Sequence, residues 1–214
     1  MNIQKLAAAS WLTDQSAMPA ITERYLGLFT AVGTDAGTGF TEVSGGSYAR
    51  VGFTGTSFGT PGGTAPTSIA SSAALSFAQA TANWGTVIAW GLFDAATGGD
   101  LLQWDFLGAS PYFPFVCTLA SPGVLTAYGI TAGSTPALAD GATVIVTDEM
   151  GGALPTGLAR YSLYTVAGLS GDTFNVGVNT TTTGSGMVRQ VQQQSIPSGV
   201  TASFGSGQIT LLVS

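Results

Sequence analysis

The sequence predicts an all-β protein, with a β-sandwich or jelly-roll-like core, one short N-terminal helix and an inserted smaller β domain. Short apolar runs alternate with clusters of turn residues along most of the chain, which is the pattern of short strands. The 31 glycines and 9 prolines among 214 residues supply those turns. Only 7% of the residues are charged, against about 25% in a typical domain. The surface must therefore be built from Ser, Thr, Asn, Gln and Gly, or be covered by partners. We expect a mixture of the two, with substantial burial against other copies of the chain.

The clearest predicted element is a β-hairpin between Trp84 and Trp104. Residues 84–93 are apolar on both alternating faces, residues 94–99 carry turn chemistry, and residues 101–106 form the return strand. A strand that is apolar on both faces is covered on both faces. Because the chain predicts little helix, we expect the second cover to be another sheet or another subunit.

The N-terminal residues predict the helix, and the first strand follows it. Residues 3–12 place Leu6 at helical spacing with its apolar neighbours, and Trp11 less regularly. A helix of this length is marginal alone, so we expect it to dock on a neighbouring copy. Residues 24–30 predict the first strand, and residues 69–77 predict a later one.

A change in composition near residue 109 predicts two domains. A core domain would comprise residues 1–108 plus 189–214, and residues 109–188 would form an inserted β module that projects outward. Insertions at exposed loop tips are tolerated by many folds. Strands are predicted within the module at residues 124–130, 143–147, 161–166 and 173–178.

Two low-complexity or terminal segments complete the prediction. The Thr- and Gly-rich tract at residues 179–186 predicts an exposed turn. Residues 200–204 and 208–213 predict a closing hairpin around a Gly-Ser-Gly turn.

The composition excludes several classes of function. The chain has no histidine and one cysteine, Cys117, so it has neither an intrachain disulfide nor a cysteine-based zinc site. Its net charge is −6 and its five basic residues are scattered, which argues against direct nucleic-acid binding. No apolar run is long enough for a membrane span, and no signal segment precedes the first strand. We expect synthesis and assembly inside a cell, with no cofactor.

Three stretches resemble a family of tailed-bacteriophage structural proteins usually labelled tail-fibre proteins. They include EVSGGSYAR at residues 42–50 and LFDAATGG at residues 92–99, in the order that the family has them. The resemblance covers most of residues 24–108 and 192–214. Residues 123–176 resemble a second, phage-associated β module. The resemblance implies a virion protein, made in the host cytoplasm, with other virion proteins as partners.

The leading hypothesis is a non-enzymatic structural component of a tailed-phage virion, acting through oligomeric assembly, with a trimer favoured. Tail or fibre attachment and capsid decoration both stay open. The alternative is a host-receptor or carbohydrate-binding fibre module, which predicts exposed aromatic residues around positions 112–164. A hydrolase acting on surface sugars is the third hypothesis, and it would need two close carboxylates.

The candidate contact residues are aromatic or apolar, with one arginine: Leu6, Trp11, Arg50, Trp84, Trp90, Phe93 and Trp104. Because charges are so few, we expect Arg50 to be paired, either with Glu42 or with an acid on a neighbour. Trp84, Trp90, Trp104 and Tyr112 also fit a sugar-stacking platform, but their strand context favours packing. Acidic side chains near the hairpin and in later loops lack a catalytic or calcium-loop motif, so no catalytic, cofactor-binding or metal residue is predicted.

Overall fold

The computed structural model describes residues 23–34, 38–54, 57–60, 67–108, 110–134 and 136–213. The chain forms two compact units. Unit 1 comprises Met1–Asp105 and Gln194–Ser214, and unit 2 comprises Phe106–Gln193. The predicted all-β class is confirmed, because strands make up almost all of the regular structure. The predicted helix at residues 3–12, with Leu6 and Trp11, lies outside the described residues.

The strands of unit 1 come from both ends of the chain. They are β1 (Arg24–Ala31), β2 (Thr41–Glu42), β3 (Val51–Phe53), β4 (Thr67–Ala70), β5 (Leu75–Ser76), β6 (Thr86–Val87), β7 (Ala89–Phe93), β8 (Leu101–Phe106, whose last residue begins unit 2), β16 (Gln194–Ser195), β17 (Ser203–Phe204) and β18 (Thr210–Val213).

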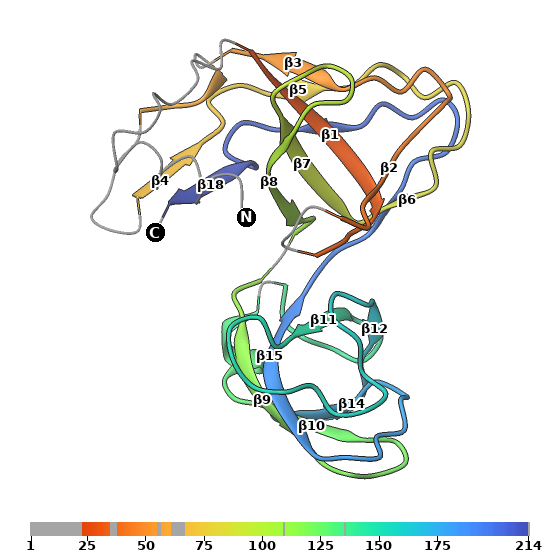
Figure 1. The fold of residues 1–214 in the computed structure, drawn as a ribbon, viewed down its shortest axis with the longest axis vertical. Coiled ribbons are helices and arrows are strands. Elements are labelled where there is room, and N and C mark those ends of the chain that lie inside the picture. The colour runs from red at the N-terminus through yellow and green to blue at the C-terminus, as the bar shows by residue number, and fades with distance from the viewer. Residues whose placement is uncertain are drawn as a thin grey trace. The chain divides into compact units, whose positions relative to one another are not determined.

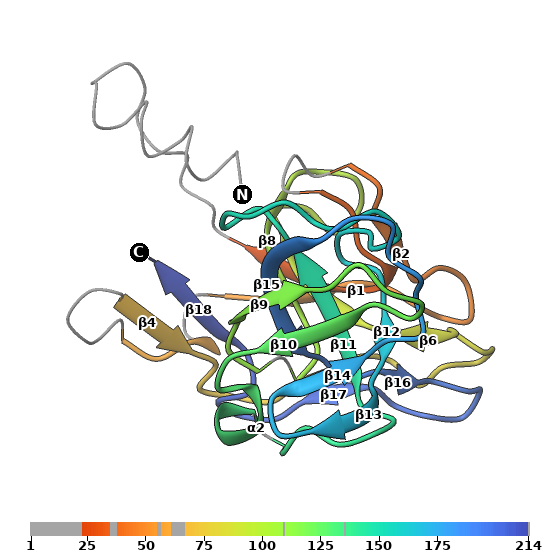
Figure 2. The same cartoon turned by 90° about the horizontal axis from the view of Figure 1, so that it is seen from below.

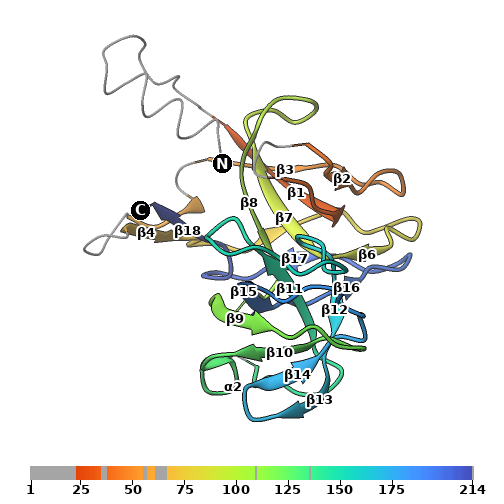
Figure 3. The same cartoon turned by 60° about the horizontal axis from the view of Figure 1, so that its bottom comes forward.

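Strand β1 is the centre of the main sheet of unit 1. The sheet runs β2-β1-β7-β8, and β3 also pairs with β1 (Figure 3). Leu28 lies opposite Trp90, and Gly27 lies opposite Gly91. All five residues of β7 are buried, so both faces of this strand are covered within one chain. The predicted hairpin and first strand are confirmed.

The C-terminal segment pairs with earlier strands of unit 1. Strand β16 pairs with β6, β17 with β5 and β18 with β4. Figure 1 shows β18 beside β4. The predicted closing hairpin is therefore wrong, since its two runs pair with β5 and β4 instead of with each other. Ser71 explains the arrangement, because its backbone N–H donates to Ile209 and its carbonyl accepts from Gly207.

Unit 2 contains one seven-stranded sheet and one short helix (Figure 2). Its elements are β9 (Phe113–Cys117), β10 (Val124–Ala127), α2 (Ile130–Gly133), β11 (Thr143–Thr147), β12 (Tyr164–Thr165), β13 (Ala167–Ser170), β14 (Thr173–Asn175) and β15 (Gly184–Gln190). The described residues contain no helix that is long and apolar enough to cross a membrane.

The sheet of unit 2 curls into a nearly closed barrel. Its order is β12-β11-β15-β9-β10-β14-β13, and the two strands at its ends are separated in the chain by Val166 alone. The segment Tyr164–Ser170 thus pairs with β11 through its first half and with β14 through its second. Closure leaves almost no free strand edge.

The core of unit 2 fills the inside of this barrel. Inward residues alternate along the strands, as the period of two requires. The largest fully buried side chains inside it are Phe115, Phe174, Leu125, Ile130, Val144 and Val146. Cys117 on β9 also points into this core, where it is buried as a small apolar residue.

Several predictions inside unit 2 need correction. The predicted strand at residues 161–166 begins only at Tyr164, since Tyr161 has a positive φ, and the one at residues 173–178 ends at Asn175. The predicted strand at residues 124–130 ends at Ala127, because Gly129 adopts a left-handed conformation and α2 begins at Ile130. The tract at residues 179–186 is not simply an exposed turn. Thr180 is buried and its hydroxyl donates to the Thr118 carbonyl at 2.6 Å, while Gly184–Gly186 lie in β15.

The two ends of unit 2 are hydrogen-bonded to each other. The Gln192 backbone N–H donates to the Leu107 carbonyl at 2.8 Å, and the Ser110 N–H donates to the Gln190 carbonyl at 2.9 Å. A closed barrel with adjacent ends has its own core and needs no strand from the rest of the chain.

Residues 106–193 expressed alone are therefore expected to fold. We expect a β-type far-ultraviolet circular dichroism spectrum and one cooperative thermal transition. An expanded chain without a cooperative transition would contradict the autonomy of unit 2.

Candidate functional site

The strongest concentration of polar contacts in unit 1 joins the EVSGGSYAR segment to the turn of the β7–β8 hairpin. We call it the Arg50 cluster: the side chains of Glu42, Tyr48, Arg50 and Phe93, with the carbonyls of Ala95 and Gly98. Glu42 ends β2, and Arg50 directly precedes β3.

A tight turn brings Tyr48 and Arg50 back toward Glu42. Gly45 and Gly46 have positive φ values, which glycine adopts without strain. Ser47, which follows them, also has a positive φ. A side chain at Gly46 would also lie 2.9 Å from the Ala82 backbone nitrogen. The Gly46 carbonyl accepts a hydrogen bond from the Trp84 indole at 2.9 Å, so the turn is fixed to the chain before β6.

The Arg50 guanidinium binds two segments at once. Its Nε and one terminal nitrogen donate to the two Glu42 carboxylate oxygens at 2.8 and 2.7 Å. Its other terminal nitrogen donates to the carbonyls of Ala95 and Gly98 at 2.8 and 2.7 Å. The guanidinium carbon lies 3.3 Å from the centre of the Phe93 ring. Only 8% of the Arg50 side chain is exposed, and hydrogen bonds from a charged guanidinium are stronger than those between neutral groups.

Tyr48 extends the cluster to the central strand. Its hydroxyl donates to Glu42 Oε1 at 2.8 Å and accepts the Leu28 backbone N–H at 2.8 Å. Burial raises the pKa of Tyr48 well above its ordinary value. The hydroxyl therefore stays protonated and continues to donate to the carboxylate.

Two glycines make room for these side chains. A Cβ on Gly27 would lie 2.8 Å from Phe93 and 3.0 Å from the Glu42 carboxylate, and a Cβ on Gly91 would lie 2.5 Å from Phe29. The rings of Phe29 and Phe93, 5.8 Å apart, pack over this glycine pair. The Phe40 ring packs between the rings of Phe29 and Trp104 and contacts both.

The one carboxylate of the cluster accepts hydrogen bonds from both Arg50 and Tyr48. These bonds fix the positions of the three side chains relative to one another. The predicted pairing of Arg50 with Glu42 is confirmed. Tyr48 and Gly27 were not predicted from the sequence, although Tyr48 lies two residues from Arg50 within the EVSGGSYAR motif.

Comparison with known proteins bears on the same part of the chain. The family described as podophage GP4 fiber I protein gp80 matches residues 2–111. The chain belongs to this family. No curated protein matches it in sequence. The matched range includes both segments that Arg50 joins, and it agrees with the resemblance to phage fibre proteins.

The other candidate contact residues of this fibre-family chain lie in different environments. Trp84, Trp90 and Phe93 are buried within unit 1, so each can add little further buried area in an assembly. Their role in contacts between copies stays a prediction. Trp104 is half-buried and packs edge-on against Phe40 at 5.1 Å.

The acidic residues of the loops make hydrogen bonds within the fold. Asp94 Oδ1 accepts the Asp100 backbone N–H at 2.7 Å and closes the hairpin turn. Asp140 accepts the Leu169 N–H at 2.8 Å. Within the described ranges, no three metal-binding side chains form a group, and Asp35 lies outside those ranges.

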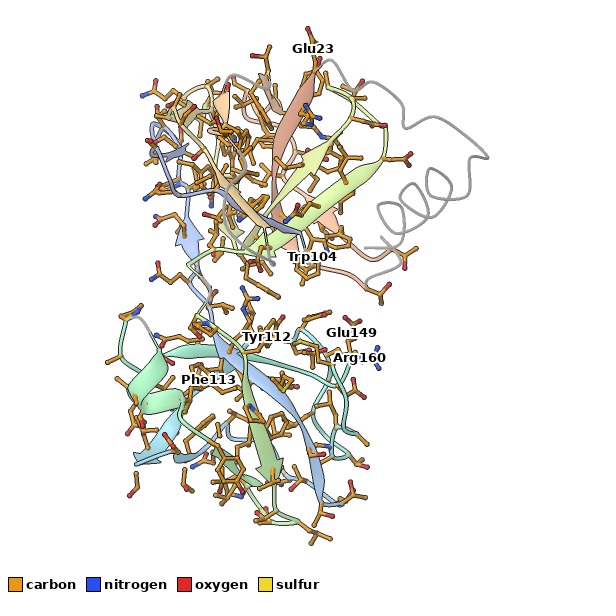
Figure 4. The ribbon with its side chains drawn as sticks, turned by 90° about the vertical axis from the view of Figure 1, so that its left-hand side faces the viewer. Glu23, Trp104, Tyr112, Phe113, Glu149 and Arg160 are labelled. Carbon is orange, nitrogen blue, oxygen red and sulfur yellow. The ribbon has the colours of Figure 1, made fainter. Side chains whose placement is uncertain are left out.

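A second polar cluster lies on the surface of unit 2. Arg160 pairs with Asp148 and Glu149, and Tyr161 donates to Glu149. Figure 4 shows Arg160 beside Glu149. The hydrogen bond from Arg160 lowers the pKa of Asp148. Arg160 is 48% exposed, and such surface pairs contribute little to stability.

Replacing Arg50 tests the structural role of its cluster. We expect Arg50→Ala to lower the free energy of unfolding by about 2–4 kcal/mol, because Glu42 and two carbonyls lose their charged partner. Arg160→Ala is the matched control and should cost less than about 1 kcal/mol. Chemical denaturation monitored by far-ultraviolet circular dichroism reports on the strands of both units and measures both variants, and equal effects would contradict the assignment.

Proposed function

We propose that this protein is a structural component of a podophage fibre and assembles as a homotrimer through unit 1. The observation that carries the proposal is the family match, which spans residues 2–111 and so falls almost entirely in unit 1. The match to a fibre family favours fibre attachment over capsid decoration. The chain would be made in the host cytoplasm, join other virion proteins and perform no catalysis.

Strand β8 is the surface that we assign to self-association. It is the last strand in the order β2-β1-β7-β8, and end strands are templates for pairing. Leu101, Leu102 and Trp104 on this strand are each half-buried, so part of their apolar surface is open to a partner. The low charge, 5 basic plus 11 acidic residues in 214, leaves few repulsive contacts between copies.

The division into two units suits this arrangement. The barrel of unit 2 closes its own edges, and it lies almost wholly outside the matched family range. Self-association through the strands of unit 1 would therefore need no strand of unit 2.

Native mass spectrometry of the full chain tests the proposal. We expect a trimer, and Leu102→Glu should shift it to monomer because a charge would be desolvated at the interface. Val200→Glu, at another partly exposed apolar position of unit 1, should leave the trimer intact. A wild-type monomer at high concentration would contradict assembly, and a different closed oligomer would contradict the trimer.

A further inference from the structure

One outer face of the barrel in unit 2 combines apolar and hydroxyl groups. On β9 and β10, Phe115, Cys117 and Leu125 point into the core, so the residues between them point outward. Val116 lies opposite Thr126 on one side and Ser185 on the other, and Thr126 lies opposite Thr173. We call this surface the Tyr128 face: Pro114, Val116, Thr126, Tyr128, Thr173 and Ser185.

The apolar side chains of this face are unusually open to solvent. Tyr128 is 57% exposed and Val116 is 45% exposed. The Tyr128 N–H donates to the Pro114 carbonyl at 3.0 Å, which places Tyr128 beside the outward row of β9. Leu119, in the turn that follows β9, is 62% exposed. Single exposed apolar residues are ordinary, but these three belong to one strand pair and its turn.

The hydroxyl groups of the face are available to a ligand. Among the residues that the structure describes, the hydroxyls of Thr126, Tyr128 and Thr173 make no hydrogen bond to the protein. Each hydroxyl can donate one hydrogen bond and accept two. Adjacent strands are about 4.8 Å apart, so the groups on β15, β9, β10 and β14 span about 14 Å of rigid surface.

The face carries no formal charge. The nearest acid along the chain is Asp172, in the turn before β14, and its carboxylate accepts from the Gly129 N–H, the Thr131 N–H and the Thr131 hydroxyl. Arg189 lies further along β15 and is buried. The face offers no exposed cation to pair with an anionic ligand. A neutral ligand needs no such partner.

The closed barrel also limits how a partner can bind. A peptide that adds a strand needs a free sheet edge, and Tyr164–Ser170 connects the two ends of this sheet. Recognition must therefore use side chains. An aromatic ring and an apolar neighbour among free hydroxyls match a sugar, which presents C–H groups on its ring face and hydroxyls around its rim.

We propose that the Tyr128 face binds a neutral carbohydrate chain. The sugar ring stacks on Tyr128 and contacts Val116, while Thr126 and Thr173 exchange hydrogen bonds with its hydroxyls. This site lies in unit 2 and does not depend on self-association through unit 1.

A glycan array that holds neutral and anionic oligosaccharides tests the proposal with the full-length protein. We expect binding to neutral glycans, at least tenfold weaker in Tyr128→Ala and also weaker in Val116→Asn. Met150→Ala removes an apolar side chain of similar exposure (54%) from a different loop of unit 2, and it should bind as the wild type does. An unchanged thermal midpoint shows that each variant is folded.

Three results would overturn the proposal. They are no binding to any neutral glycan, binding to anionic glycans alone, and binding that survives Tyr128→Ala. Native mass spectrometry of Tyr128→Ala adds a fourth outcome, since loss of an oligomer would mean that a second copy covers this face. Assembly through β8 is measured by Leu102→Glu, so the two proposals can fail independently.

Discussion

One guanidinium group holds together the part of the chain that defines its family. Arg50 donates four hydrogen bonds, two to the Glu42 carboxylate and two to carbonyls in the hairpin turn. It also lies over the Phe93 ring. Only a planar group with fixed, diverging donors can reach all of these partners, so a lysine could not replace it. The hairpin turn and the EVSGGSYAR segment are thereby held together.

The glycines of the sheet make this arrangement possible. Gly27 and Gly91 lie opposite each other on β1 and β7, and a methyl group on either would overlap an aromatic side chain. Glycine weakens a strand in isolation. Here the absence of side chains at Gly27 and Gly91 leaves space for Phe29, Phe93 and the Glu42 carboxylate. Close packing of these groups accompanies the lower strand preference of glycine.

Local patterns predicted more of this fold than long-range pairings did. The hairpin, the first strand and β11 follow from alternating apolar residues and glycine turns, and each of these signals lies within about ten residues. The partners of β17 and β18 could not be predicted in the same way. Both runs look like one hairpin, yet each pairs with a strand more than 120 residues earlier.

The candidate site was predicted in part for a similar reason. Arg50 stood out because charges are scarce, and Glu42 was the acid within its own motif. Tyr48 gave no such signal, since a tyrosine next to a turn has many possible roles. Its hydroxyl matters because Leu28 and Glu42 approach it in three dimensions. Closure of the barrel through Tyr164–Ser170 was equally invisible, since this one short segment pairs with β11 through its first half and with β14 through its second.

Native-state hydrogen exchange in Arg50→Lys tests the central claim most directly. The Asp100 amide closes the hairpin turn through Asp94, and its protection depends on whether Arg50 holds that turn. The variant should lose protection at Asp94 and Asp100, while amides of the barrel, such as Val146 and Val188, keep theirs. Unchanged protection of the turn would show that Arg50 does not fasten the hairpin to the EVSGGSYAR segment.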